Sequence, residues 1–239
     1  MSKKPFVPLL AALGAIGFVV SLWLVFVEAP AEYSYDPATG LLAGSSLFFN
    51  YKIFYFHVAH AFWLFGAVFV SGASSIAFLK TRNPKWDDLA SAATDVAVAF
   101  GAVVLVTGSV WAKAAWDVWW KWEPRLTLSL LLWLVLVGYT LVRRFAGPAG
   151  DRIAAGMAIF GMVGVPFIYK MVGQDSHPPS GSEGVVANLG ADKLAAFWTS
   201  VATFLCWFLA LTLARVDSTR AERELRELRE RALDEGVLQ

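Results

Sequence analysis

The amino-acid sequence predicts an all-α membrane protein with six transmembrane helices. Of the 239 residues, 57% are hydrophobic and 16% are charged, and the mean hydropathy is +0.56, far above that of an ordinary soluble domain. A helix needs about 20 apolar residues to cross the hydrocarbon core of a bilayer, and six stretches of the chain reach that length. They cover roughly residues 6–27, 54–79, 89–110, 126–145, 153–172 and 193–214.

The first of these stretches follows the short basic sequence MSKK. It is too long for the apolar part of a secretory signal peptide, and it has no A-x-A-like cleavage site. We therefore expect it to remain as a membrane helix. The fourth stretch begins just after Pro124, and proline is well suited to the first position of a helix.

The distribution of lysine and arginine predicts the orientation of these spans, because short cytoplasmic loops are enriched in both residues. The loops expected on the other side, roughly 28–53, 111–125 and 173–192, carry few of them. The basic residues gather on one side, at Lys3, Lys4, Lys80, Arg82, Lys85, Arg143, Arg144, Arg152 and from Arg215 onward. We expect that side, with both termini, to be cytoplasmic.

The end of the chain, residues 215–239, predicts a short, charged cytoplasmic helix that follows a six-helix domain of residues 1–214. Pairs such as Glu222 with Arg226 have the i,i+4 spacing that stabilises a helix. A thin apolar stripe runs along it, formed by Ala221, Leu225, Leu228 and Ala232. The helix is either a solvated extension or a docking element.

Several classes of protein are excluded by composition and motifs. The formal net charge is +1, which gives no reason to expect a nucleic-acid partner. Cys206 is the only cysteine, so the chain has no internal disulfide and no CxxC pair. The sequence also lacks the CxxCH haem-attachment motif and the phosphate loop GxxxxGK[ST], so it is neither a c-type cytochrome nor itself an ATPase.

Histidines and tryptophans gather on the side opposite the basic loops. His57 and His60 lie near the start of the second span, and His177 lies in the last outer loop. The outer loop between the third and fourth spans carries five tryptophans, which are Trp111, Trp116, Trp119, Trp120 and Trp122. Rings and imidazoles are therefore expected at one membrane face.

This combination suits the binding of haem. Histidine is the common axial ligand of haem iron, aromatic faces pack against a flat macrocycle, and cations bind its propionates. Lys113, Lys121 and Arg125 lie within or beside the tryptophans. His57 and His60 are three residues apart on one helix and cannot bind opposite faces of one macrocycle, so two-histidine ligation needs His177.

Other interpretations remain open at this point. Tryptophans also anchor membrane proteins at the interface, and Trp23, Trp133 and Trp207 fit that role or a place in the core. A histidine at a helix end is often only a hydrogen-bonding residue. The chain could also be a quinone-linked membrane cytochrome b, or a structural subunit that scaffolds a transporter. Zinc is disfavoured, because a closed zinc site needs four ligands.

Three segments carry a resemblance to a known family. The segment GSVWAKAAWDVWWKWEPRLTLSLLLWL resembles the tryptophan-rich motif of the haem-handling membrane proteins of cytochrome c biogenesis. APAEY and YKIFYFHVAHAFW are also similar to segments of one family in this group, cytochrome c maturation protein C, or haem exporter protein C. The resemblance spans roughly residues 6–214.

The resemblance implies a role as well as a site. His57 and His177 would be the axial ligands of a transient, non-covalent haem b at the periplasmic face of the inner membrane, with the five tryptophans as its platform. The implied function is haem delivery rather than catalysis. The implied partners are a periplasmic haem chaperone, a small single-helix subunit and the subunits of an ABC transporter.

The sequence departs from the family pattern at a few positions. Glu123 stands where the motif usually has aspartate, and Pro124 follows it where the motif usually has no proline. A glutamate there keeps the negative charge and can still cap the next helix. His60 occupies a position that is usually not histidine, which leaves its role open, and the outer loop at 28–53 is longer than is typical.

Overall fold

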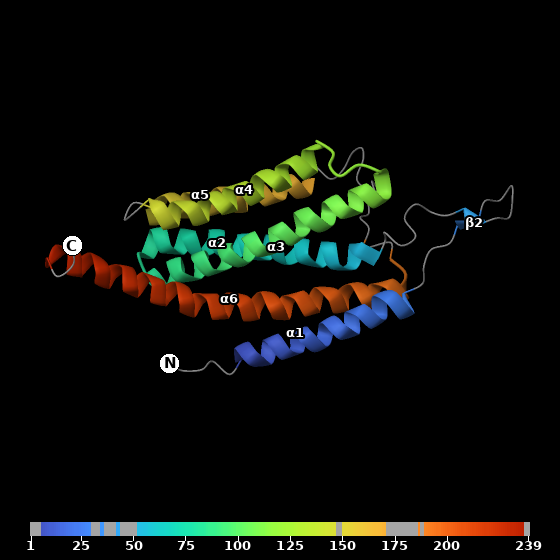
Figure 1. The fold of residues 1–239 in the computed structure, drawn as a ribbon, viewed down its shortest axis with the longest axis horizontal. Helices are drawn as coiled ribbons and strands as arrows, with labels where there is room; N and C mark the ends of the chain where they lie inside the picture. The colour runs from blue at the N-terminus through green and yellow to red at the C-terminus, as the bar shows by residue number, and fades with distance from the viewer. Residues whose placement is uncertain are drawn as a thin grey trace.

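A computed structural model describes residues 6–29, 34–35, 42–43, 52–146, 150–170, 186 and 189–236 of the chain. The described residues form six long helices (Figure 1). These are α1 (Phe6–Trp23), α2 (Lys52–Thr81), α3 (Pro84–Trp116), α4 (Pro124–Phe145), α5 (Gly150–Lys170) and α6 (Ala191–Asp234). A π-helical turn, η1 (Leu24–Glu28), extends α1, and two short strands, β1 (Ser34–Tyr35) and β2 (Leu42–Ala43), pair antiparallel.

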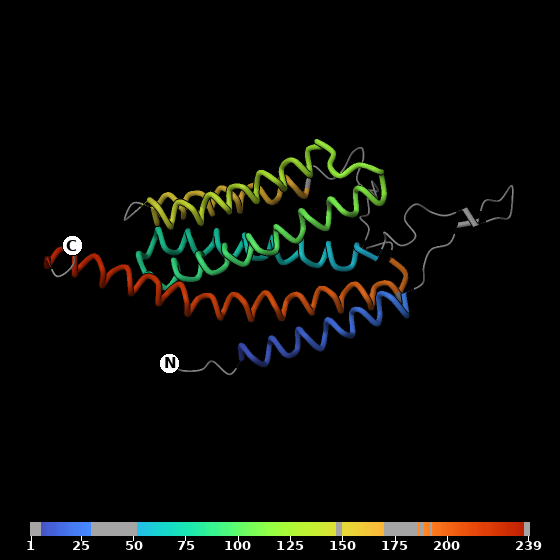
Figure 2. The backbone as a smooth tube through the Cα atoms, viewed as in Figure 1, coloured from blue at the N-terminus to red at the C-terminus, as the bar shows by residue number. Residues whose placement is uncertain are grey.

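The six helices form one elongated bundle whose axes run in roughly the same direction (Figures 1 and 2). Helix α2 lies in its centre and packs against α3, α5 and α6. Helix α1 covers α6 on one side, and α4 packs against α5 and α3 on the other. All six helices are long and apolar enough to cross a membrane, which confirms the prediction of an all-α, six-span membrane protein.

The bundle is held together by apolar packing and by small residues that let helices approach closely. Its centre is a cluster from five helices that includes Leu64, Phe100, Leu136, Val165 and Phe208. Between α2 and α5, a methyl group added to Gly72 would lie 2.5 Å from Cβ of Met162, so only glycine fits there. Small residues at contacts between transmembrane helices are the usual solution where lipid supplies no hydrophobic driving force.

Helix α3 extends beyond the predicted stretch 89–110 at both ends. At its start, the side chain of Asn83 accepts a hydrogen bond from the backbone N–H of Lys85 at 3.1 Å, and Pro84 occupies the first turn. At its other end, the alanines between Trp111 and Trp116 favour continued helix. The prediction stopped at residue 110 because it relied on an apolar window, which says nothing about where the helical backbone ends.

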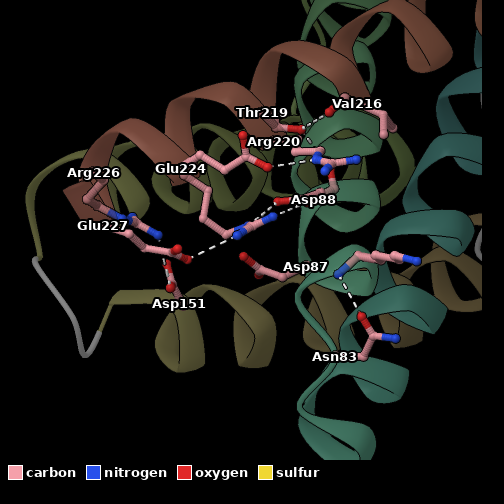
Figure 3. Close-up of polar contacts among 12 residues, drawn as sticks. Asn83, Asp87, Asp88, Asp151, Val216, Thr219, Arg220, Glu224, Arg226 and Glu227 are labelled. Carbon is pink, nitrogen blue, oxygen red and sulfur yellow. Dashed lines mark hydrogen bonds and ion pairs between the residues drawn. The ribbon is translucent and has the colours of Figure 1, made fainter. Parts of the chain in front are cut away.

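Helix α6 also runs further than predicted, since it continues without a break from Ala191 to Asp234 and through the expected boundary at residue 214. Its last part, the expected tail, lies against the ends of α3 and α5 (Figure 3). Arg223 binds Asp88 through two nitrogens at 2.9 and 3.1 Å, and Arg226 binds Asp151 at 3.2 Å.

Two further arginines complete this group of ion pairs. Arg143 on α4 binds both carboxylate oxygens of Asp87 at 2.7 and 2.8 Å. Arg215 bridges Asp95 and Glu222, each at 2.6 Å. We call this part of the bundle, defined by Arg143, Arg215, Arg223 and Arg226 with their carboxylate partners, the arginine end.

The opposite end of the bundle holds the start of α2, the end of α3 and the start of α4, and we call it the tryptophan end. Here Lys52 is buried, and its ammonium group donates hydrogen bonds to the backbone carbonyls of Val25 and Ala29. A cation at the carbonyl end of a helix is favourable. These bonds tie the end of α1 and η1 to the first residue of α2.

Candidate functional site

The tryptophan end is shaped by a tight turn after α3. Asp117 adopts a left-handed conformation, with φ 58° and ψ 22°, and its N–H donates to the carbonyl of Lys113 at 3.0 Å. The chain then turns back, and α4 begins at Pro124 with Glu123 at the capping position. The side chain of Glu123 makes no capping hydrogen bond to α4, although the sequence suggested that it could.

An open groove lies between α2, α3 and α4 at this end. The groove itself has room of about 90 Å³ for water-sized molecules, and all the space between its walls out to open solvent amounts to about 900 Å³. Its lining is mainly apolar and aromatic, with a few polar groups, which is the composition of cofactor sites in general. The residues that carry the argument below are His57, Gly108, Trp111, Trp116, Trp120 and Arg125.

His57 lies on α2 and is half-buried in the groove wall. Its Nδ1 is 2.8 Å from the hydroxyl oxygen of Thr107 on α3. Its ring meets Trp111 edge to face, with centroids 5.7 Å apart and planes at 70°. A methyl group added to Gly108 would lie 3.1 Å from Cε1 of His57. The imidazole is therefore seated directly against α3, and a larger residue at position 108 would press on its ring.

The five tryptophans divide into two groups. Trp111, Trp116 and Trp120 line the groove, whereas Trp119 and Trp122 are 62% and 77% exposed. The indole N–H of Trp120 is buried and has no hydrogen-bond acceptor among the described residues. A buried donor without an acceptor is costly, so this group suits a site that receives an acceptor from a ligand.

The three candidate cations also differ in their surroundings. The ammonium group of Lys113 pairs with Asp117, and that of Lys121 lies 4.7 Å from the ring centre of Trp116. Arg125 lines the groove and is half-buried. Its guanidinium makes no direct hydrogen bond or ion pair with another described residue, although the charge of nearby Glu123 acts on it. Of the three, Arg125 is thus the cation best placed to bind an anionic group in the groove.

His60 does not share the environment of His57, although the two are only three residues apart. Its Nδ1 donates to the carbonyl of Phe56 at 2.8 Å, and its ring lies against Phe204 and Phe100, with centroids 3.9 and 5.3 Å away. Positions i and i+3 differ by about 60° around a helix, which is enough to turn His60 away from the groove. It is a packing residue between α2, α3 and α6.

The remaining residues singled out from the sequence either fall outside the described residues or lie away from the groove. His177 falls in the segment 171–185, which is outside them, so its distance from His57 stays untested. Trp207 packs against Gly14 of α1, as a core residue would, and Trp23 is exposed. The described residues contain no group of three or more histidine, cysteine or acidic side chains that could hold a metal ion.

Reasoning from the sequence missed several residues of the groove. Trp133, which the sequence suggested as an anchor or core residue, lines the groove and donates its indole N–H to the carbonyl of Val98 at 2.9 Å. The place of Thr107 and Gly108 in the groove could not be recognised from the sequence, because single small or polar residues are common in membrane helices. One signal was available, since Gly101 and Gly108 are seven residues apart and so lie on one face of α3.

Comparison with known proteins identifies the family of the chain. The family model described as heme exporter protein C matches residues 1–231. The heme exporter protein C of Escherichia coli (strain K12) is 30% identical over 218 residues, which cover 88% of this chain and 82% of that protein. The heme exporter protein C of Bradyrhizobium diazoefficiens is 33% identical over 186 residues, with 74% and 69% covered.

A more distant relative comes from a plant. A protein of Marchantia polymorpha, described as a putative cytochrome c biosynthesis ccmC-like mitochondrial protein, is 27% identical over 157 residues, which cover 65% of this chain and 60% of that protein. The match of the family model extends from the first residue past the end of the sixth predicted span. The chain therefore belongs to the heme exporter protein C family.

Proposed function

We propose that this protein binds haem b, transiently and without covalent attachment, at the periplasmic face of the bacterial inner membrane. It then delivers the haem to a periplasmic chaperone for cytochrome c maturation. The observation that carries the proposal is the groove, which brings His57 together with three tryptophans and Arg125. Membership of the heme exporter protein C family supports haem as the cargo.

The groove offers each kind of contact that haem requires. An imidazole is a standard iron ligand, and His57 is the one histidine among the described residues that lines the groove. Trp111, Trp116 and Trp120 offer flat apolar surface to the macrocycle. Arg125 and the indole N–H of Trp120 are the donors available to a propionate. In this proposal His177 is the second axial ligand.

The openness of the site suits delivery rather than permanent storage. Trp119 and Trp122 lie outside the groove and are exposed, so their rings are available to a partner protein. Tryptophan is enriched at the centres of protein interfaces. We assign these two rings to contact with the periplasmic haem chaperone, and we expect a small single-helix subunit and the subunits of an ABC transporter as the other partners.

The proposal also fixes the orientation of the bundle. Helices α3 and α6 place their arginine and aspartate residues at the end opposite the groove. Basic residues favour the cytoplasmic side, so the arginine end with both termini is cytoplasmic and the tryptophan end is periplasmic. Labelling of single cysteines, placed at Trp122 and at Arg229 in a Cys206→Ser background, with a membrane-impermeant reagent checks this orientation in intact spheroplasts.

The visible spectrum of the purified protein tests haem binding directly. We expect the wild-type protein to purify with a Soret band, and we expect the double variant His57→Ala/His177→Ala to lose it. His60→Gln is the matched control, because His60 lies outside the groove, and it should keep the band. A Soret band of unchanged position and intensity in the double variant would contradict the proposal.

The rival function as a quinone-linked cytochrome b makes a different prediction. Haem in such a protein would stay bound through purification, would be reduced by a quinol analogue and would not pass to a chaperone. We expect the opposite, namely that bound haem moves to an added apo-chaperone while quinol leaves its spectrum unchanged. Reduction by quinol without transfer would favour the cytochrome instead.

A further inference from the structure

A short chain of hydrogen bonds connects His57 to the backbone of α3. The Nδ1 atom of His57 lies 2.8 Å from Oγ1 of Thr107. The same hydroxyl group donates a hydrogen bond to the carbonyl of Val103 at 2.7 Å, with the carbonyl of Val104 at 3.3 Å. Thr107 therefore stands between the imidazole and carbonyl groups that belong to its own helix.

This arrangement favours one position for the ring hydrogen of His57. A hydroxyl group has one hydrogen to donate and can accept with its lone pairs, whereas a backbone carbonyl can only accept. When the hydroxyl hydrogen of Thr107 is donated to the carbonyl of Val103, Oγ1 meets Nδ1 as an acceptor. Nδ1 must then carry a hydrogen, and in the neutral imidazole the lone pair is on Nε2.

We propose that Thr107 is a positioning residue that holds His57 in the Nδ1–H tautomer and so presents the lone pair of Nε2 for binding to iron. This inference rests on the proposed function, since it says how the ligand is prepared. Neutral histidine in water prefers the opposite tautomer, with the hydrogen on Nε2, in which Nε2 cannot ligate a metal. The hydrogen bond to Thr107 reverses that preference before any haem arrives.

The surroundings of the ring restrict its rotation as well. The ring of Trp111 meets the imidazole edge to face, with centroids 5.7 Å apart. Cε1 of the imidazole lies close to Gly108, where an added carbon would be only 3.1 Å away. Histidines that bind metals usually donate their other N–H to a fixed acceptor, which sets the ring orientation and raises the basicity of the ligand. Here a threonine hydroxyl takes the place of the more common carboxylate or backbone carbonyl.

Nitrogen-15 NMR of the full-length, haem-free protein in nanodiscs tests the tautomer without any dependence on haem. Histidine-selective labelling gives three residues to observe, and His57→Gln identifies the signals of His57. We expect the wild-type and Thr107→Ser proteins to show His57 with hydrogen on Nδ1. Thr107→Val has the same shape without the acceptor, and we expect its His57 to shift toward the Nε2–H form. A His57 tautomer that is the same in all three proteins would overturn the inference.

Haem binding provides the second measurement. We expect Thr107→Val to bind haem roughly 10- to 100-fold more weakly than wild type, the usual cost of removing such a partner. Its remaining haem should have a higher midpoint potential, because a less basic imidazole stabilises ferric iron less. Thr107→Ser should restore both values. Thr140→Val is the matched control, since Thr140 also donates to the carbonyl three residues before it, at 2.7 Å, but lies far from the groove lining.

The two measurements separate this inference from the proposed function. If His57→Ala loses haem while Thr107→Val keeps wild-type affinity and potential, the positioning role is wrong and the haem site stands. If His57→Ala keeps its haem, the proposed function is wrong in assigning His57 as a haem ligand, whatever tautomer the NMR spectra show. A Thr107→Val protein with wild-type helix content and elution volume excludes misfolding as the cause of its weaker binding.

Discussion

At the arginine end each of four guanidinium groups binds at least one carboxylate, whereas at the tryptophan end Arg125 lies beside an open groove. The arginine pairs join four helices, since α6 reaches both α3 and α5 and α4 reaches α3. Several of these carboxylates are nearly inaccessible, with side-chain exposures of 4% for Asp87 and 3% for Asp88. Buried carboxylates of this kind depend on their partners.

The difference between the two ends shows what each arrangement is suited for. Where guanidinium groups pair with carboxylates of neighbouring helices, the pairs fix the helix ends to one another. Where the protein leaves a guanidinium and an indole N–H beside an aromatic groove, the missing acceptor has to come from outside. The first arrangement stabilises the fold, and the second suits binding of a cargo with carboxylate groups.

The largest effect is expected from breaking an ion pair at the arginine end. Arg143→Ala leaves Asp87 buried without its cation, which typically costs about 3–5 kcal/mol in the free energy of unfolding. Unfolding of the purified protein by titration with a denaturing detergent measures this. Arg220→Ala is the control, because Arg220 and Glu224 are 63% and 51% exposed, and it should change the free energy of unfolding far less.

The same variants show whether the two ends are independent. We expect Arg143→Ala to keep the wild-type amount of haem per folded molecule, because the groove shares no residue with the arginine end. Loss of haem in step with loss of stability would show instead that the ion pairs also hold the groove in shape.

A second large effect is expected at Gly108, which lines the groove beside His57. Gly108→Leu places a side chain where Cε1 of His57 lies, with the first added carbon already only 3.1 Å away. Displacement of an iron ligand should weaken haem binding by roughly 100-fold, or about 2.7 kcal/mol. Haem titration measures the loss. Gly156→Leu in α5 is a matched control, since nothing lies within 4 Å of the added carbon there.

A smaller effect is expected from the cation in the groove. Arg125→Gln should weaken haem binding about tenfold, because one charge-assisted hydrogen bond contributes roughly 1.5–3 kcal/mol. Lys113→Gln should change it far less, since Lys113 is already paired with Asp117. Equal losses in both variants, measured by the same titration, would mean that the propionates do not distinguish the two cations.

The smallest effect is expected from the exposed tryptophans. Trp122 is 77% exposed and touches Trp120 only edge to face, at 6.0 Å between centroids. Trp122→Ala should therefore weaken haem binding less than about twofold, while it slows transfer of haem to the chaperone. Trp120→Ala should instead weaken haem binding more than it slows transfer of haem to the chaperone. Stopped-flow measurement of transfer, combined with titration, separates the two steps.

The sequence was sufficient to predict the fold, because six apolar stretches of the right length leave few alternatives for a chain of this composition. It also predicted that His57, the tryptophan segment and Arg125 would lie near one another, and the structure brings them to one groove. What it could not show was how the tryptophans divide. That division depends on a left-handed residue, Asp117, which ends α3 just after Trp116 and sends the following rings to different sides.

The hydrogen bond between Thr107 and His57 could not be predicted from the sequence either. Thr107 is a single threonine in an apolar helix, and its importance arises only when α2 packs against α3 in one register. The same holds for the separation of His57 from His60, since their spacing is compatible with a shared face or with two separate environments. Which of these occurs depends on where Phe100 and Phe204 pack.

Helix α6 carries a mechanical consequence of its own. With 44 residues at about 1.5 Å each, it is a rod of roughly 66 Å that starts beside the tryptophan end and finishes beyond the arginine end. It contains neither glycine nor proline, the residues at which helices most often bend. Without such a bending point, a displacement of its far tip is expected to move the described helix Ala191–Asp234 as one piece.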